Sequence, residues 1–148
     1  MLRQPKRLEM VTTRMCDEMI LFGLKVEDGR RWYSIDERDW RPMKIGETVL
    51  PGFFWIPVAD DENGAWSSYW MRLQPGARSL EHQHDSTELI LILDGVFTDD
   101  DGTNFLPGQT VCYPAGSKHR TSSEEGCTVL VVARTGSKIV SQSRGTGA

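Results

Sequence analysis

The segment GARSLEHQHDSTELILILDG, residues 76–95, decides the fold and directs the search for function. The chain has only three histidines, and two of them, His82 and His84, lie here one residue apart. Glu88 follows four positions later, and an apolar run begins directly after it. Side chains in a strand alternate between its two faces, so a single strand over residues 82–93 would place these three polar side chains on one face.

The apolar run indicates where that face points. It continues the polar face with Ile90 and Ile92, and the opposite face carries three leucines, Leu89, Leu91 and Leu93. A segment that is apolar on both faces is typical of a strand buried between two sheets or inside a barrel. We therefore expect the polar side chains to point into the interior, where burial without partners costs on the order of several kcal/mol.

A divalent cation would offset that cost. Imidazole nitrogen and carboxylate oxygen suit zinc, iron, nickel or manganese. The third histidine, His119, follows a turn signal at residues 114–116, so a neighbouring strand can bring it to the same place. The residues predict one metal site formed by His82, His84, Glu88 and His119; the alternative is that each histidine is a surface residue or a hydrogen-bonded core residue.

Short strand-like stretches separated by turn residues fill the rest of the chain. Strands are predicted at residues 31–40, 53–58, 66–73, 108–114 and 127–134, whereas residues 19–24 fit either a strand or a short helix. Pro51-Gly52 is interpreted as a turn, and the acidic run 99–101 as a solvated hairpin turn. This pattern predicts an all-β sandwich or barrel.

Composition excludes several classes of protein. A length of 148 residues suits one domain, and 17 Lys and Arg against 21 Asp and Glu argue against nucleic acid as a partner. No apolar run approaches the roughly 20 residues that span a bilayer, and the N-terminal residues lack the apolar core of a secretory signal. Cys16, Cys112 and Cys127 show no CxxC spacing. We therefore expect a cytoplasmic protein with free thiols and without a membrane partner.

Two spaced motifs in the chain resemble those of the cupin superfamily, the RmlC-like fold. The first is a glycine, five residues, HxH, three or four residues, a glutamate, six residues and a glycine, and residues 76–95 fit every interval. The second is a glycine, five residues, PxG, two residues, a histidine, three residues and an asparagine. Residues 108–119 fit it, and Ser123 replaces the asparagine, which is not a metal ligand in the family. Residues 40–134 are more specifically similar to ChrR-type cupins, which occur as sensor domains of zinc-binding anti-sigma factors and as free-standing proteins.

The resemblance implies a double-stranded β-helix, or jelly roll, with a six-stranded barrel core at residues 41–134. It also implies an N-terminal extension, residues 1–40, whose extra strands pack on the barrel or on a partner in a homodimer; the tail, residues 135–148, is expected to be flexible. One divalent ion would be bound, with Fe²⁺ or Zn²⁺ favoured over Ni²⁺ or Mn²⁺.

The resemblance also implies a function, because four protein ligands leave two positions open on an octahedral ion. Some small cupins of this kind are dioxygenases that cleave β-diketones or aryl ketones, as acetylacetone dioxygenase does. We expect a metal-dependent oxidoreductase with a small-molecule pocket formed by Tyr69, Trp70, Arg72 and Tyr113. Further wall candidates are Phe53, Phe54, Trp55 and Trp66, for which core packing is the alternative. Two other functions stay open: a non-catalytic ChrR-like metal-bound sensor, and a non-redox cupin such as an isomerase or a sugar-binding protein.

Overall fold

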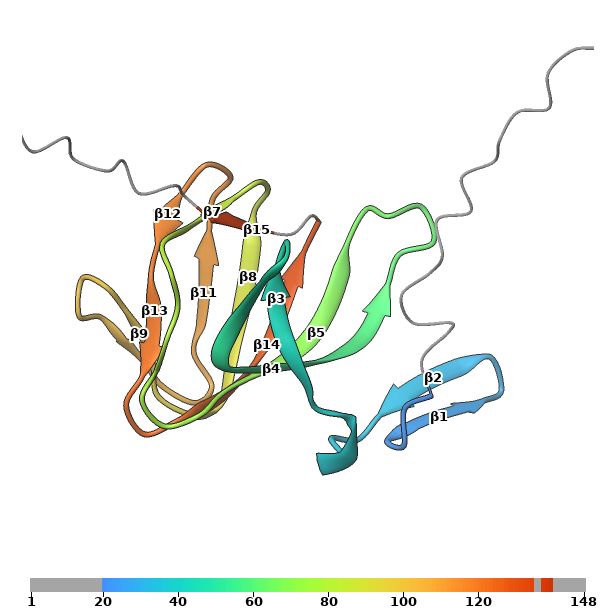
Figure 1. The fold of residues 1–148 in the computed structure, drawn as a ribbon. Helices are drawn as coiled ribbons and strands as arrows, with labels where there is room; N and C mark the ends of the chain where they lie inside the picture. The colour runs from blue at the N-terminus through green and yellow to red at the C-terminus, as the bar shows by residue number, and fades with distance from the viewer. Residues whose placement is uncertain (1–19, 135–136, 140–148) are drawn as a thin grey trace, which may run out of the picture.

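The computed structural model describes residues 20–134 and 137–139. Within these residues there is no α-helix; one 3-10 turn, η1 (Glu37–Asp39), interrupts a chain otherwise made of strands and loops. Two layers of antiparallel strands face each other (Figure 1). The all-β jelly roll predicted from the sequence is confirmed.

The larger layer is a six-stranded sheet in the order β11-β8-β14-β5-β4-β3. Its central strand, β14, pairs with β8 on one side and β5 on the other, so that Val129 lies opposite both Ile92 and Met71. The strands are β3 (Arg41–Ile45), β4 (Thr48–Asp60), β5 (Ser67–Leu73), β8 (Glu88–Gly95), β11 (Thr110–Tyr113) and β14 (Cys127–Ala133).

The facing layer consists of two smaller sheets, in the orders β10-β9-β13-β6 and β12-β7-β15. Their strands are β6 (Ala77–Arg78), β7 (His82–His84), β9 (Phe97–Asp99), β10 (Asn104–Phe105), β12 (Lys118–His119), β13 (Thr121–Ser123) and β15 (Ser137–Ile139). The expectation of a closed six-stranded barrel is wrong, because these sheets remain separate from the larger one.

The core lies between the layers. Ile90, Val129 and Val131 of the larger sheet and Phe97 of β9 are at most 1% exposed. The outer face of β8 behaves differently, since Leu89 and Leu93 are 42% and 49% exposed. The predicted burial of both faces of this strand is therefore wrong; an antiparallel sheet packs one face on the core and leaves the other outside.

Two local sequence predictions, a turn and a long strand, are wrong. The predicted turn at Pro51-Gly52 is wrong, because β4 runs through it and the register with β3 shifts between Pro42 and Lys44. The strand predicted over residues 31–40 stops early, since β2 (Arg30–Tyr33) is followed by η1. Residues 51–52 belong to an irregular part of the β3–β4 ladder, and the residues after β2 form a short 3-10 turn.

An N-terminal hairpin, β1 (Leu24–Glu27) with β2, stands beside the jelly roll (Figure 1). The buried carboxylate of Asp39 accepts hydrogen bonds from the backbone N–H groups of Phe22 and Gly23 and from the hydroxyl of Tyr33, at 2.6–2.9 Å. Burial alone would raise the pKa of Asp39, but these three donors outweigh it and hold the pKa below its usual value. The hydrogen bonds of Asp39 thereby link η1 to the residues that precede β1 and to β2.

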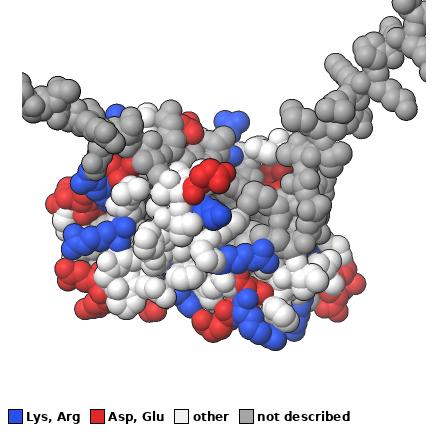
Figure 2. Space-filling model, in the orientation of Figure 1, with Lys and Arg blue, Asp and Glu red and all other residues white. Residues whose placement is uncertain are grey.

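The domain limits, with a jelly roll at 41–134, stay predictions. Residues 1–19 of the extension, with Cys16, lie outside the described residues, as do residues 135–136 and 140–148 of the tail. Lys and Arg residues are interspersed with Asp and Glu over the face shown in Figure 2. Among the described residues, no helix has the length and apolar character needed to cross a membrane.

Candidate metal centre

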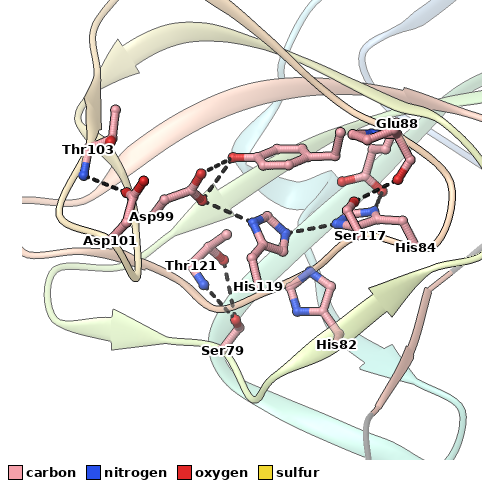
Figure 3. A network of polar contacts seen from close by, with 12 residues as sticks. Ser79, His82, His84, Glu88, Asp99, Asp101, Thr103, Ser117, His119 and Thr121 are labelled. Atoms are coloured by element: carbon pink, nitrogen blue, oxygen red, sulfur yellow. Dashed lines mark hydrogen bonds and ion pairs between the residues drawn. The ribbon is translucent and has the colours of Figure 1, made fainter.

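Three histidines meet because two short strands pair. His82 and His84 are the first and last residues of β7, and His119 ends β12. The two strands are antiparallel with His119 directly opposite His82, so the register sets the three side chains together. Figure 3 shows the three imidazoles gathered at one point.

The geometry of this group suits a single ion. One ring nitrogen from each histidine lies within 4.8 Å of the others, and the three residues are 8%, 1% and 5% exposed in chain order. The Nε2 atoms of His84 and His119 are 2.8 Å apart. Adjacent ligands on an octahedral ion with bonds of about 2.1 Å would be roughly 3.0 Å apart, so this spacing needs little adjustment.

Glu88 lies beside the histidines without sharing their strand. Residues 85–87 separate β7 from β8, and the two strands belong to different sheets. The single strand assumed over residues 82–93 is therefore wrong, although a Glu88 carboxylate oxygen lies 3.4 Å from Nδ1 of His84. The set of ligand atoms within 4.8 Å of one another contains the three histidines and not Glu88, so the role of Glu88 as a ligand stays a prediction.

The environment of His82 favours metal binding, and Nδ1 of His84 has no hydrogen-bond partner among the described residues. Burial lowers the pKa of His82, because charging a buried ring is costly, and only neutral imidazole offers a lone pair. Nδ1 of His82 lies 3.0 Å from the carbonyl oxygen of Leu80, so the Nδ1–H donates there and Nε2 is left with its lone pair. Nδ1 of His84 is buried without a hydrogen-bond partner. The donor set therefore fits a divalent metal ion.

Asp99 and Tyr113 contact the histidines and fix the orientation of their rings. His119 Nδ1 lies 2.9 Å from Oδ1 of Asp99, and the Tyr113 hydroxyl donates to both oxygens of the same carboxylate at 2.8 Å. Burial, followed by the hydrogen bond to Asp99, raises the pKa of Tyr113, so the phenol stays protonated. The interpretation of the whole acidic run as a solvated turn is wrong for Asp99, whose side chain is 13% exposed.

Sequence reasoning had no signal for this support. Asp99 and His119 are 20 residues apart, and they meet only because β9 pairs with β13, where Asp99 lies opposite Thr121. Asp101, two residues further along, instead accepts a hydrogen bond from the backbone N–H of Thr103 and stabilises the turn.

A cavity of about 660 Å³ opens onto the centre. His82, Glu88 and His119 contribute to its wall. The large apolar side chains of the wall come from β3, β4, β5, β8 and β9: Met43, Ile45, Leu50, Phe53, Trp55, Met71, Ile90 and Phe97. The space can therefore hold a small molecule against the histidines, mainly through apolar contacts.

The predicted pocket residues divide between the two faces of the sheet. Tyr69 lines the cavity, and burial raises its pKa well above the usual value, so it remains a hydroxyl donor. Trp70 and Arg72 do not line it; Arg72 pairs with Glu37 at 2.8 Å and stacks over Trp40 on the other face. Strand alternation, which places residues 70 and 72 opposite residue 69, explains this placement.

The remaining predicted wall residues also divide. Phe53 and Trp55 line the cavity, whereas Phe54 and the 42% exposed Trp66 do not. Tyr113 lies outside the cavity wall and stacks on His84, with ring centroids 5.3 Å apart and an interplanar angle of 4°. Its contacts are with the histidines and Asp99.

Comparison with known families decides the assignment. The family model of the ChrR cupin-like domain matches residues 29–136, which is most of the chain. The chain belongs to the ChrR cupin-like family. The match extends from the N-terminal hairpin through the histidine centre to the end of the larger sheet. A comparison with curated protein sequences finds no match.

Solved structures share the fold of this ChrR cupin-like chain at low sequence identity. Acetylacetone dioxygenase from Acinetobacter johnsonii is similar with a TM-score of 0.66 and 11% identity, over 79% of this chain and 82% of that one. The anti-sigma ChrR, solved with SigE of Rhodobacter sphaeroides, gives 0.53 and 21%, over 64% and 47%. The DMSP lyase DddQ from Ruegeria pomeroyi gives 0.55 and 21%, over 68% and 60%. At these identities the likeness establishes the fold.

Proposed function

We propose that this ChrR cupin-like chain is a metal-dependent dioxygenase that cleaves a small, neutral, mainly apolar ketone, of the β-diketone or aryl ketone class. The observation that carries the proposal is that the buried three-histidine group, whose ring nitrogens lie close enough to bind one ion, borders a cavity of about 660 Å³ with large apolar side chains in its wall. A purely structural metal site is closed by its protein ligands, whereas a catalytic site keeps positions open to a cavity.

The cavity wall supports the choice of substrate class. Among the described lining residues, Lys44 is the single cationic side chain, and it is outnumbered by Asp60, Asp61, Glu62 and Glu88. With one divalent ion bound, four carboxylates and one ammonium still leave a net charge of about −1, which favours a neutral substrate over a carboxylate or phosphate. Near the large apolar side chains such as Phe53, the hydroxyl groups of a sugar would lack partners, so this part of the wall favours an apolar ligand.

In this proposal the histidines bind the metal ion, and the apolar wall keeps water away from the ketone. His82, His84 and His119 would hold the ion, with Glu88 as the proposed fourth ligand. Fe²⁺ bound there would supply Lewis acidity and electron exchange with dioxygen. The apolar wall would exclude water and orient the ketone toward the histidines, and the Tyr69 hydroxyl can donate a hydrogen bond to a substrate oxygen.

Oxygen consumption tests this proposal. Apoprotein is loaded with Fe(II) without air, mixed with acetylacetone or an aryl ketone, and then exposed to air. We expect uptake that needs both metal and ketone, that is lost in His119→Ala, and that persists in Arg72→Ala, whose side chain lies on the opposite sheet face. Loaded protein that consumes no oxygen with any ketone of the panel would contradict the dioxygenase assignment.

A metal-bound sensor is the second candidate function, favoured by membership of the ChrR cupin-like family and by the similarity to ChrR, which was solved with SigE. Metal binding without oxygen uptake, together with metal-dependent binding to a protein partner, would support it. A non-redox cupin would instead convert a ligand without oxygen. The proposed homodimer and the cytoplasmic location stay predictions; light scattering on the purified protein checks the first.

A further inference from the structure

The side chain of Asp99 points inward to the histidine centre (Figure 3), whereas Asp100 and Asp101 of the same acidic run are exposed. It ends β9, and its backbone is fixed on two sides: its N–H donates to the carbonyl oxygen of Thr103, and its carbonyl oxygen accepts from Gly102. The pairing with Thr121 of β13 adds a third constraint. The carboxylate is therefore held in place by the sheet and the turn.

The hydrogen bonds at this carboxylate determine the tautomer of His119. An ionised carboxylate only accepts hydrogen bonds, so both Tyr113 and Nδ1 of His119 must donate to it, at 2.8 and 2.9 Å. A neutral His119 with its proton on Nδ1 has a lone pair on Nε2. That Nε2 is the atom 2.8 Å from His84 Nε2 in the three-histidine group.

Tyr113 connects this arrangement to a second histidine. Its hydroxyl is bound to Asp99, which fixes the direction of its ring. The ring lies parallel to that of His84, with centroids 5.3 Å apart, and tilted against that of His119 at 4.2 Å. Two of the three imidazoles therefore contact the ring of Tyr113, whose hydroxyl is hydrogen-bonded to Asp99.

We propose that Asp99, with Tyr113 bound to it, is a positioning residue that fixes the Nδ1–H tautomer of His119 and so prepares its Nε2 for the metal. The inference rests on the proposed metal site for its second half; the tautomer belongs to the metal-free protein. Carboxylates that accept from a ligating histidine orient the ring and raise its basicity, and losing one lowers metal affinity about 10–100-fold.

The first test reads the tautomer directly. Nitrogen-15 NMR of the imidazole rings in metal-free protein at pH 8 should show His119 protonated at Nδ1. Asp99→Ala should give a mixture of both tautomers, whereas Asp99→Asn, whose amide oxygen still accepts a hydrogen bond, should keep the wild-type form. A wild-type His119 protonated at Nε2, or an unchanged tautomer in Asp99→Ala, would overturn the proposal.

The second test measures Zn²⁺ affinity by competition with a chelator. We expect Asp99→Ala to bind about 10–100-fold more weakly and Tyr113→Phe to be weakened less, with both variants folded by circular dichroism. Asp101→Ala, in the same turn, should match the wild type. An Asp99→Ala variant with wild-type affinity would overturn the role in metal binding. Wild-type protein that binds no metal would instead overturn the proposed function, and the NMR result would still decide the tautomer.

Discussion

Gly95, which closes the motif around the histidines, is predicted to tolerate a side chain poorly, for two independent reasons. Its φ of +77° is in the left-handed region, which costs an L-residue about 1–2 kcal/mol. A Cβ there would lie 2.0 Å from the carbonyl oxygen of Gly126 and 2.7 Å from Cα of Cys127. Both are backbone atoms, and Cys127 pairs with strands on both sides, so neither neighbour can move cheaply. Overpacking adds about 1–3 kcal/mol, and we expect Gly95→Ala to lose roughly 2–5 kcal/mol of unfolding free energy.

Gly102 is the matched control for this substitution. Its φ of +86° resembles that of Gly95, but a Cβ at this position would meet nothing within 4 Å. Gly102→Ala should therefore lose only the conformational contribution, about 1–2 kcal/mol. Urea unfolding of the metal-free proteins, followed by tryptophan fluorescence, measures both losses. Equal losses in the two variants would refute the steric part of the reasoning.

Two further predictions concern parts of the chain outside the metal centre. Asp39→Asn should cost about 1–3 kcal/mol in urea unfolding, because an amide cannot accept all three hydrogen bonds, including that of Tyr33. A loss no larger than that of Asp36→Asn, at the half-buried residue that caps η1, would argue against the role of Asp39 in attaching the hairpin. Burial raises the pKa of the Cys127 thiol to about 11, so its reactive thiolate is scarce below that pH. Brief iodoacetamide treatment at pH 8, mapped by mass spectrometry, should label the exposed Cys112 and spare Cys127, and equal labelling would contradict its burial.

Local patterns predicted the class of fold and the meeting of the histidines well. The HxH spacing, the PxG turn before His119 and the strands around them are local features, and the structure pairs β7 with β12 so that the three rings meet. The strands at residues 66–73 and 127–134 are confirmed as β5 and β14. Aromatic residues in the first and valines and a threonine in the second are common in strands, and turn residues flank both.

The features that sequence reasoning missed depend on contacts between distant residues. The break between β7 and β8 places Glu88 in another sheet, which spacing along one strand does not reveal. Alternation places Arg72 on the face of β5 opposite Tyr69, but the sequence does not reveal which of these two faces borders the cavity. In the structure Arg72 lies on the other face, where it contacts Glu37 and Trp40. Asp99 reaches His119 through the pairing of β9 with β13, whereas its neighbours in the acidic run remain at the turn.

The metal content of the protein tests the central claim most directly. The chain is stripped with a chelator and dialysed against Fe²⁺, Zn²⁺, Ni²⁺ or Mn²⁺ in separate samples, and bound metal is measured by mass spectrometry of the digested protein. The account predicts about one ion per chain for at least one of these metals, and its loss in His84→Ala, because that ring belongs to the three-histidine group and is its most buried member. Wild-type protein without bound metal, or full occupancy in His84→Ala, would contradict it.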